Sequence, residues 1–183
     1  MIGELPRVLV WLMASLVASW AMAEEERQLV VVMGAKGDLE FAAPFAEATG
    51  KWVDAADAGG DFTTKVVTTR AELKMEVAAA VKNKPPELWI VLIGHGTFDQ
   101  RVAKFNTKGP DVSASELAEW LEPVESELVF INTASASAPF LAKLKGQNRT
   151  LISATKSGAE VNVTRFGGFL AESLQAPDAD LNK

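Results

Sequence analysis

Four continuous apolar runs, each ended by glycine or other small residues, constrain the fold more than any other feature of the chain. They lie in segments 27–37, 87–96, 127–137 and 148–158. Runs of this kind suit strands that are buried on both faces of a sheet. Segments with helical spacing separate them. The sequence therefore predicts one α/β domain with an open, mainly parallel sheet and helices on both faces.

The segments between these runs predict the remaining elements. Between the first two runs we expect a helix that stops at Gly50, a Gly- and Asp-rich loop over 51–63, a short strand over 65–69 and a helix over 70–84. Segment 97–113 is predicted to be a polar loop, because it lacks both apolar periodicities.

Three further helices are expected in the second half of the chain. Ser113 and Glu116 have the spacing of a capping box, which predicts the start of the first of them. The other two are expected over 138–146 and 164–174, directly after the third apolar run and near the end of the chain.

The first 23 residues have the pattern of a secretory signal peptide. Arg7 precedes an apolar run over 8–20, and a small-x-small triplet ends at Ala23. The run is too short for a typical membrane span. We expect cleavage after Ala23, a mature protein that is secreted or periplasmic, and no membrane attachment after cleavage. An uncleaved membrane anchor is the alternative. The folded domain is expected over 24–174.

Composition excludes several classes of function. The chain has no cysteine, which excludes a cysteine nucleophile and thiolate metal sites. His95 is its one histidine, so a multi-histidine zinc site is excluded too. The net charge of −6, with no basic stripe, argues against nucleic-acid binding. No cofactor is predicted.

The second apolar run ends in Gly94-His95-Gly96, at the edge of the sheet where ligand sites of such folds lie. An imidazole there can serve as a general base, and the flanking glycines allow close approach of a substrate. A histidine that merely braces a loop is the alternative. Asp99 is a weaker candidate for orienting the imidazole.

The third run ends in a turn of very small residues that offers hydroxyl groups at the same edge. Ser135 is the candidate nucleophile, 40 residues after His95. Asn132, Thr133 and Ser137 are candidate binding residues of this turn. Tight packing of a strand against a helix is the alternative explanation of the small residues.

Thr155, at the end of the fourth run, is a further candidate binding residue. The turn Gly34–Gly37 resembles part of a phosphate loop but lacks the full spacing, so a flavodoxin-like nucleotide binder is a weaker alternative. Arg149 and Arg165 are single charges without a pattern, which predicts surface positions for both.

The segment 175–183 is expected to be a polar tail. Asp178, Asp180 and Asn182 alternate as the oxygen ligands of a calcium loop do, although the glycine of that pattern is missing. We expect either a plain polar tail or the start of a truncated calcium-binding repeat, which could bind calcium only if the chain continued.

The order of these motifs resembles the caspase-like fold, and within it the legumain-type (C13-like) peptidases. Segment 88–97, LWIVLIGHGT, is similar to their histidine strand, and segment 128–141, LVFINTASASAPFL, to their nucleophile segment. Segment 149–160 is similar to the strand and turn that come after the nucleophile in those peptidases. The resemblance covers residues 28–174 and implies a caspase-haemoglobinase-like three-layer sandwich.

The chain departs from that resemblance at the nucleophile. Ser135 stands where the resemblance places cysteine, or Ala134 if the register shifts by one residue, and a serine hydroxyl is far harder to deprotonate than a thiol. The resemblance therefore implies a pseudopeptidase, a non-catalytic domain that binds a peptide or protein partner in its cleft. The alternative is an active serine variant in which His95 is the base and the amides of Gly96 and Ser135 form the oxyanion hole.

Overall fold

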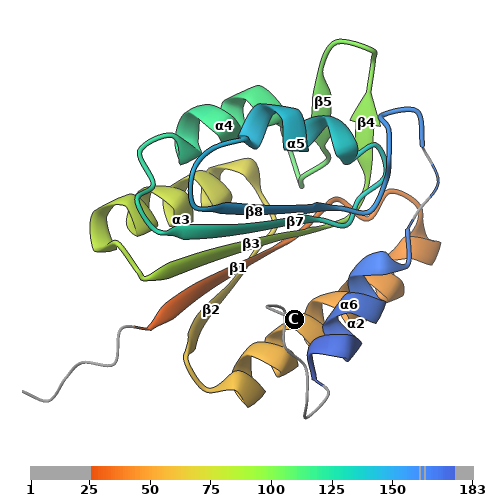
Figure 1. The fold of residues 1–183 in the computed structure, drawn as a ribbon. Coiled ribbons are helices and arrows are strands. Elements are labelled where there is room, and N and C mark those ends of the chain that lie inside the picture. The colour runs from red at the N-terminus through yellow and green to blue at the C-terminus, as the bar shows by residue number, and fades with distance from the viewer. Residues whose placement is uncertain (1–25, 161, 163, 176–183) are drawn as a thin grey trace, which may run out of the picture.

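The computed structural model describes residues 26–160, 162 and 164–175, and these residues form three layers (Figure 1). The middle layer is a parallel five-stranded sheet in the order β2-β1-β3-β7-β8. Its strands are β1 (Arg27–Met33), β2 (Phe62–Val67), β3 (Glu87–Ile93), β7 (Glu127–Asn132) and β8 (Arg149–Ser153). The predicted open, mainly parallel α/β fold is confirmed.

Helices cover both faces of this sheet (Figure 1). One face carries α2 and α6, which pack against each other, and the other face carries α3, α4 and α5. The helical elements are η1 (Leu39–Phe41), α2 (Ala42–Gly59), α3 (Arg70–Asn83), α4 (Ala114–Leu121), α5 (Ala138–Leu144) and α6 (Phe166–Leu174).

The apolar runs are continuous because each strand contributes to two cores. Alternate side chains of a strand point to opposite faces of the sheet. In β1, Val30 and Val32 belong to the core under α3, α4 and α5, whereas Leu29 and Val31 belong to the core under α2 and α6. The same alternation holds in β3 and β7. Burial on both faces therefore explains why the central residues of these three strands are apolar.

The predicted loop over 51–63 is wrong in its first part. Helix α2 continues past Gly50 to Gly59, and β2 starts at Phe62 instead of residue 65. Trp52 and Ala56 are one helical turn apart, and both are buried against the sheet and α6. This burial stabilises the helix in spite of the glycines and aspartates around it.

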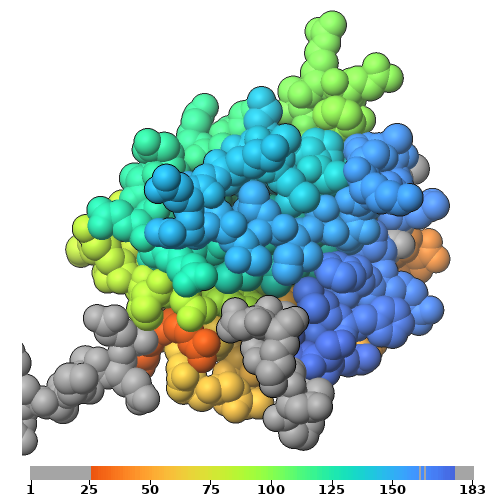
Figure 2. All heavy atoms as spheres, viewed as in Figure 1, coloured from red at the N-terminus to blue at the C-terminus, as the bar shows by residue number. Residues whose placement is uncertain are grey.

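The segment predicted as a polar loop contains a small second sheet. Strands β4 (Gly96–Phe98), β5 (Ala103–Phe105) and β6 (Val112–Ser113) pair in antiparallel order. The tip of the β4–β5 hairpin stands clear of the body of the molecule (Figure 2). The capping box of Ser113 and Glu116 is confirmed at the start of α4.

Within the part of the chain that the structure describes, no helix has both the length and the apolar character needed to cross a bilayer. The predicted signal peptide and the polar tail from 176 onward lie outside the described residues.

Candidate functional site

The carboxyl ends of β1, β3, β7 and β8 meet at one edge of the sheet, and the candidate residues lie there. Backbone hydrogen bonds continue beyond the strand ends. The amide of Gly34 donates to the carbonyl of Ile93 (2.8 Å), and the amide of Thr133 donates to that of Leu92 (3.0 Å). The turns after β1, β3 and β7 are therefore side by side, as the parallel sheet requires.

Ser135 is brought to the Gly94–Gly96 turn but is bound to the backbone there. Its Oγ accepts a hydrogen bond from the amide of Gly96 (3.2 Å) and donates one to the carbonyl of Gly96 (3.1 Å). The side chain is 3% exposed. A Cβ on Gly96 would lie 2.2 Å from the carbonyl oxygen of Ser135, so only glycine allows this approach.

His95 lies on the α2 side of the same edge. Its ring packs edge-on against Phe41 and Phe45, with centroids 4.8 and 5.0 Å away. Its Nε2 is 3.3 Å from the carbonyl oxygen of Lys36. Because a carbonyl only accepts, this contact is a hydrogen bond when Nε2 carries the proton. In the described part of the chain, no hydrogen bond joins the imidazole to Ser135.

Asp99, the candidate for orienting the imidazole, belongs to the tip of the β4–β5 hairpin. Its carboxylate accepts hydrogen bonds from the amides of Val102 (2.7 Å) and Arg101 (2.9 Å). These bonds hold the pKa of Asp99 below its ordinary value. The carboxylate therefore stabilises the hairpin turn.

Asn132 and Thr133 are also occupied by the backbone. The Oδ1 of Asn132 accepts from the amide of Ala134 (3.1 Å), and the hydroxyl of Thr133 donates to the carbonyl of Leu92 (2.8 Å). Among the described residues, the Nδ2 of Asn132 has no partner, although the side chain is only 1% exposed. The hydroxyl of Thr164 donates to the carbonyl of Thr133.

Ser137 and Thr155 form one hydroxyl pair at the start of α5. The hydroxyl oxygen of Thr155 accepts from the amides of Ser137 (3.0 Å) and Ala138 (3.2 Å). The two hydroxyl oxygens are 3.1 Å apart, and the amide of Thr155 donates to Ser137 Oγ (3.2 Å). Thr155 thus supplies the helix cap that the side chain of Ser137 does not provide.

Ala136 lies at the centre of the small-residue turn in a left-handed conformation, with a φ of 50°. This conformation costs a residue other than glycine about 1–2 kcal/mol. The residue is 1% exposed, and its amide donates to the carbonyl of Glu160 (2.8 Å). The turn is therefore sharp, buried and fixed by bonds within the protein.

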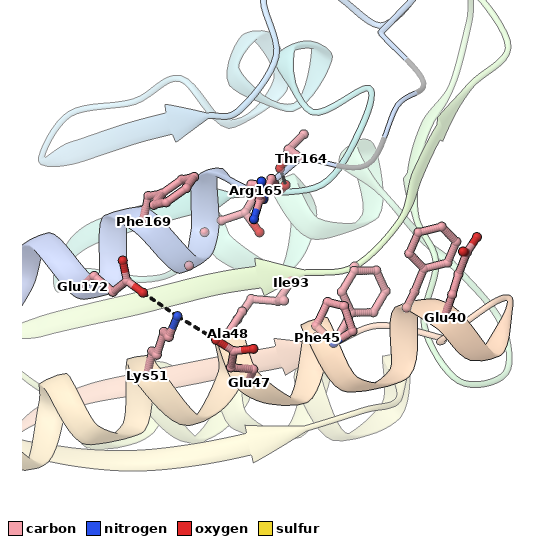
Figure 3. A pocket seen from close by; sticks show the side chains of 16 residues that line it. Glu40, Phe45, Glu47, Ala48, Lys51, Ile93, Thr164, Arg165, Phe169 and Glu172 are labelled. Atoms are coloured by element: carbon pink, nitrogen blue, oxygen red, sulfur yellow. Dashed lines mark hydrogen bonds and ion pairs between the residues drawn. The ribbon is translucent and has the colours of Figure 1, made fainter.

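A groove of about 590 Å³ opens beside this turn, between α2 and α6 (Figure 3). The strand ends contribute Ile93, Gly94 and Thr133 to its wall. Aromatic and small residues of η1 and the two helices provide most of the rest: Phe41, Pro44, Phe45, Ala48, Gly167, Gly168 and Phe169. The groove is open, and it is next to the ring of His95 because Phe41 and Phe45 contact both.

The charged residues of the groove are arranged unevenly. Lys51 on α2 pairs with Glu47 (2.9 Å) and with Glu172 of α6, and Figure 3 shows this cluster on one side of the groove. Glu172 and Glu47 hold the pKa of Lys51 above its ordinary value. Arg165 lies across the ring of Phe169 (5.7 Å), and no ion pair holds it among the described residues.

Sequence reasoning did not reveal this groove. Arg165 is more than an isolated surface charge, because it lines the groove. A usable signal was present in segment 165–169, RFGGF, because two adjacent glycines between phenylalanines are unusual in a helix. Arg149 was also predicted to lie at the surface. It is half-buried instead, and its guanidinium donates to the carbonyls of Leu144 and Leu121 (2.9 and 2.7 Å).

Two of the four amides in the Gly34–Gly37 turn are not available to a phosphate group. The amides of Gly34 and Ala35 donate to the carbonyls of Ile93 and Asn106 (both 2.8 Å), so neither is free to donate to a ligand. No cluster of metal-ligating side chains occurs in residues 26–160, 162 and 164–175. The calcium candidates Asp178, Asp180 and Asn182 lie outside these residues.

Comparison with known proteins identifies the architecture. No family model and no curated protein sequence matches the chain. The crystal structure of the Drosophila initiator caspase Dronc matches with a TM-score of 0.60 and 13% identity, over 85% of this chain and 68% of that chain. The fold is caspase-like. A protein from Geobacter sulfurreducens, also known from a crystal structure, matches over the same shares with a TM-score of 0.45 and 14% identity.

The caspase-like fold bears out the architecture that the sequence motifs implied. At 13% identity the likeness concerns the fold alone. A shared fold does not imply a shared activity, which depends on the residues of the site.

Proposed function

We propose that this caspase-like domain binds an extended peptide or protein segment in the groove between α2 and α6 and does not cleave it. One observation carries the proposal: the Ser135 hydroxyl is bound on both sides to the backbone of Gly96, beside a groove that is open. A nucleophile needs a base within hydrogen-bonding reach. The groove, by contrast, has the aromatic wall and the size typical of a ligand site.

The finer assignment is part of the same proposal. Ser135 occupies the position of the catalytic cysteine of legumain-type peptidases, and the domain is exported by the N-terminal segment 1–23. Support for this comes from the motif order in the sequence and from the caspase-like fold. Such a domain acts outside the cytoplasm as a pseudopeptidase that binds a partner.

Selection of displayed random peptides on the purified protein tests the proposal. Gly168 lines the groove, and a Cβ on it meets no atom within 4 Å, so Gly168→Leu adds a large side chain where there is space for its first atom, and Gly168→Ala is the matched control. Selected peptides should lose at least about tenfold in affinity for Gly168→Leu and keep it for Gly168→Ala. They should also remain intact by mass spectrometry after long incubation. An affinity for the selected peptides that Gly168→Leu leaves unchanged, or cleavage of the peptides, would refute the proposal.

A serine hydrolase is the second candidate, because His95 and Ser135 come after neighbouring strands of the sheet. A fluorophosphonate probe reacts covalently with an activated serine. Labelling of the native protein that disappears in Ser135→Ala would establish this candidate and overturn the binding role. We expect equal, background labelling of both proteins, because the Ser135 hydroxyl is held by Gly96.

A further inference from the structure

Two charged residues of the α2–α6 groove, Glu40 and Arg165, have no ion pair within the described part of the chain. Glu40 belongs to η1, and Arg165 is the residue directly before α6. The remaining charged residues of the groove, Glu47, Lys51 and Glu172, are paired with one another. Among the described residues, the groove therefore offers one carboxylate and one guanidinium to a ligand.

The guanidinium of Arg165 is positioned by the ring of Phe169. Its central carbon lies 5.7 Å from the ring centroid, and both side chains are exposed, Phe169 to 56%. A guanidinium that lies over a ring keeps its N–H donors at its edge, where a carboxylate can accept two of them. Since the stacking restricts the arginine before a ligand binds, less entropy is lost on binding. Arg165 and Phe169 together suit a carboxylate that has an apolar neighbour.

Glu40 is exposed and lines the groove from the η1 side. In the view of Figure 3, Phe45 and Ile93 lie between Glu40 and Arg165, so the wall between the two charges is apolar. A carboxylate attracts an ammonium or guanidinium group, and an apolar wall favours apolar side chains. A ligand that spans the groove therefore meets two opposite charges with apolar surface between them.

We propose that the segment bound in the groove carries an acidic side chain against Arg165, a basic side chain against Glu40, and apolar residues between the two. This inference rests on the proposed function and specifies the chemistry of the partner. A purely acidic segment would meet a like charge at Glu40, and a purely basic one at Arg165, which weakens binding in both cases. The groove therefore discriminates against segments of uniform charge.

Peptides that are selected on the full-length protein and are sensitive to Gly168→Leu provide the probe. They should contain both an acidic and a basic residue. Replacing the acidic residue of the peptide by its amide counterpart should lower the affinity about fivefold in the native protein and leave it unchanged in Arg165→Gln. Replacing the basic residue by glutamine should behave in the same way with respect to Glu40→Gln. Fluorescence anisotropy measures the four affinities of each cycle.

Charge reversal gives a second arm. Arg165→Glu should weaken binding of the selected peptides at least about tenfold, and peptides with lysine in place of the acidic residue should regain most of that loss. Glu40→Lys should act likewise on the basic residue of the peptide. Lys156→Gln and Glu119→Gln, at exposed positions outside the groove, are the matched controls and should leave all affinities unchanged.

The results that contradict this inference differ from those that contradict the proposed function. Peptides that depend on Gly168 but not on Arg165 or Glu40 would leave the groove as a binding site and overturn the charge pairing. Peptides that Gly168→Leu does not affect would refute the proposed function, and this inference with it. Asp178→Asn combined with Asp180→Asn in the full chain should not change the affinity. A rise of at least about tenfold would show that the chain's own tail competes for the groove, and would overturn a separate partner.

Discussion

The two parts of the candidate site, the small-residue turn after β7 and the groove between α2 and α6, are neighbours of opposite character. The turn consists of buried residues whose hydroxyls and amides bond within the protein. The groove presents the exposed ring of Phe169, paired charges and, among the described residues, an unpaired guanidinium. Polar groups that already have partners gain little from a ligand, whereas exposed apolar surface gains from being covered.

The contrast shows that a residue can lie where a nucleophile is expected without having the surroundings of one. In sequence the turn is the more suggestive region, because it carries serines where a nucleophile would be. In space, Thr133 belongs to both regions, since its carbonyl and hydroxyl are bound in the turn while it also lines the groove. A change in one region can therefore be compared with a matched change in the other.

The largest effect is expected where the turn meets Gly96. Gly96→Ala places a methyl group 2.2 Å from the carbonyl oxygen of Ser135, and two backbone segments have to separate. We expect a loss of about 3 kcal/mol in the free energy of unfolding, measured by urea denaturation. Gly50→Ala is the control, because a Cβ there meets nothing within 4 Å on α2. Equal stabilities of the two variants would mean that the turn is not tightly packed.

The next largest loss in the free energy of unfolding is expected when the hydroxyl of Thr155 is removed. Thr155→Val keeps the shape but leaves the amides of Ser137 and Ala138 without an acceptor, which should lower the free energy of unfolding by about 2 kcal/mol. Thr155→Ser keeps the oxygen and should lose less than half of that. Similar losses in both variants would show that the methyl group, rather than the hydrogen bonds, stabilises the turn.

Substitutions at two adjacent glycines of α6 give the most direct comparison of the turn with the groove. A Cβ on Gly167 would lie 2.9 Å from the side chain of Thr133, whereas a Cβ on Gly168 projects into open space. Gly167→Ala should therefore lower the free energy of unfolding by about 1 kcal/mol. Gly168→Ala should raise it by about 0.5–1 kcal/mol, because alanine is the better helix former. Thermal unfolding of both variants measures the difference, and the same sign for both would contradict an open groove.

The sequence predicted the sheet because its signal is local. The three central strands β1, β3 and β7 are apolar on both faces, and the capping box of Ser113 and Glu116 is contained within four residues. The second half of α2 was missed because its stability is not local. Trp52 is buried, and its indole donates to the carbonyl of Gly167, 115 residues away (3.1 Å).

Prediction of the candidate site from the sequence was limited in the same way, because contacts between distant segments form it. The sequence predicted that the turns after β3 and β7 share one edge, since parallel strands place them there. It did not reveal that Ser135 is bound by the backbone of Gly96, because that bond depends on the approach of two turns to within 3.2 Å. The groove was missed because helices from opposite ends of the domain form it.

The smallest expected effect is a difference in pH dependence between the two regions. The side-chain hydrogen bond from Lys51 holds the pKa of Glu47 below its ordinary value in the folded protein, and the bond to Glu172 holds the pKa of Lys51 above its ordinary value. Glu47 therefore contributes stability above its unfolded pKa, and this contribution disappears as the pH falls through the lower, folded value. Lys51 contributes below its unfolded pKa and ceases to do so as the pH rises through the folded value.

Lys51→Met removes the ion pairs of the groove and keeps the aliphatic stem. Its small loss of stability near pH 7 should vanish at about pH 3 and shrink in high salt, because the pairs are exposed. The loss in Thr155→Val should stay constant between these pH values, because its network uses hydroxyl and amide groups only. Urea midpoints of the native protein and both variants give the measurement. A loss in Lys51→Met that persists at about pH 3 would mean that the lysine stem, rather than its charge, holds α6 against α2.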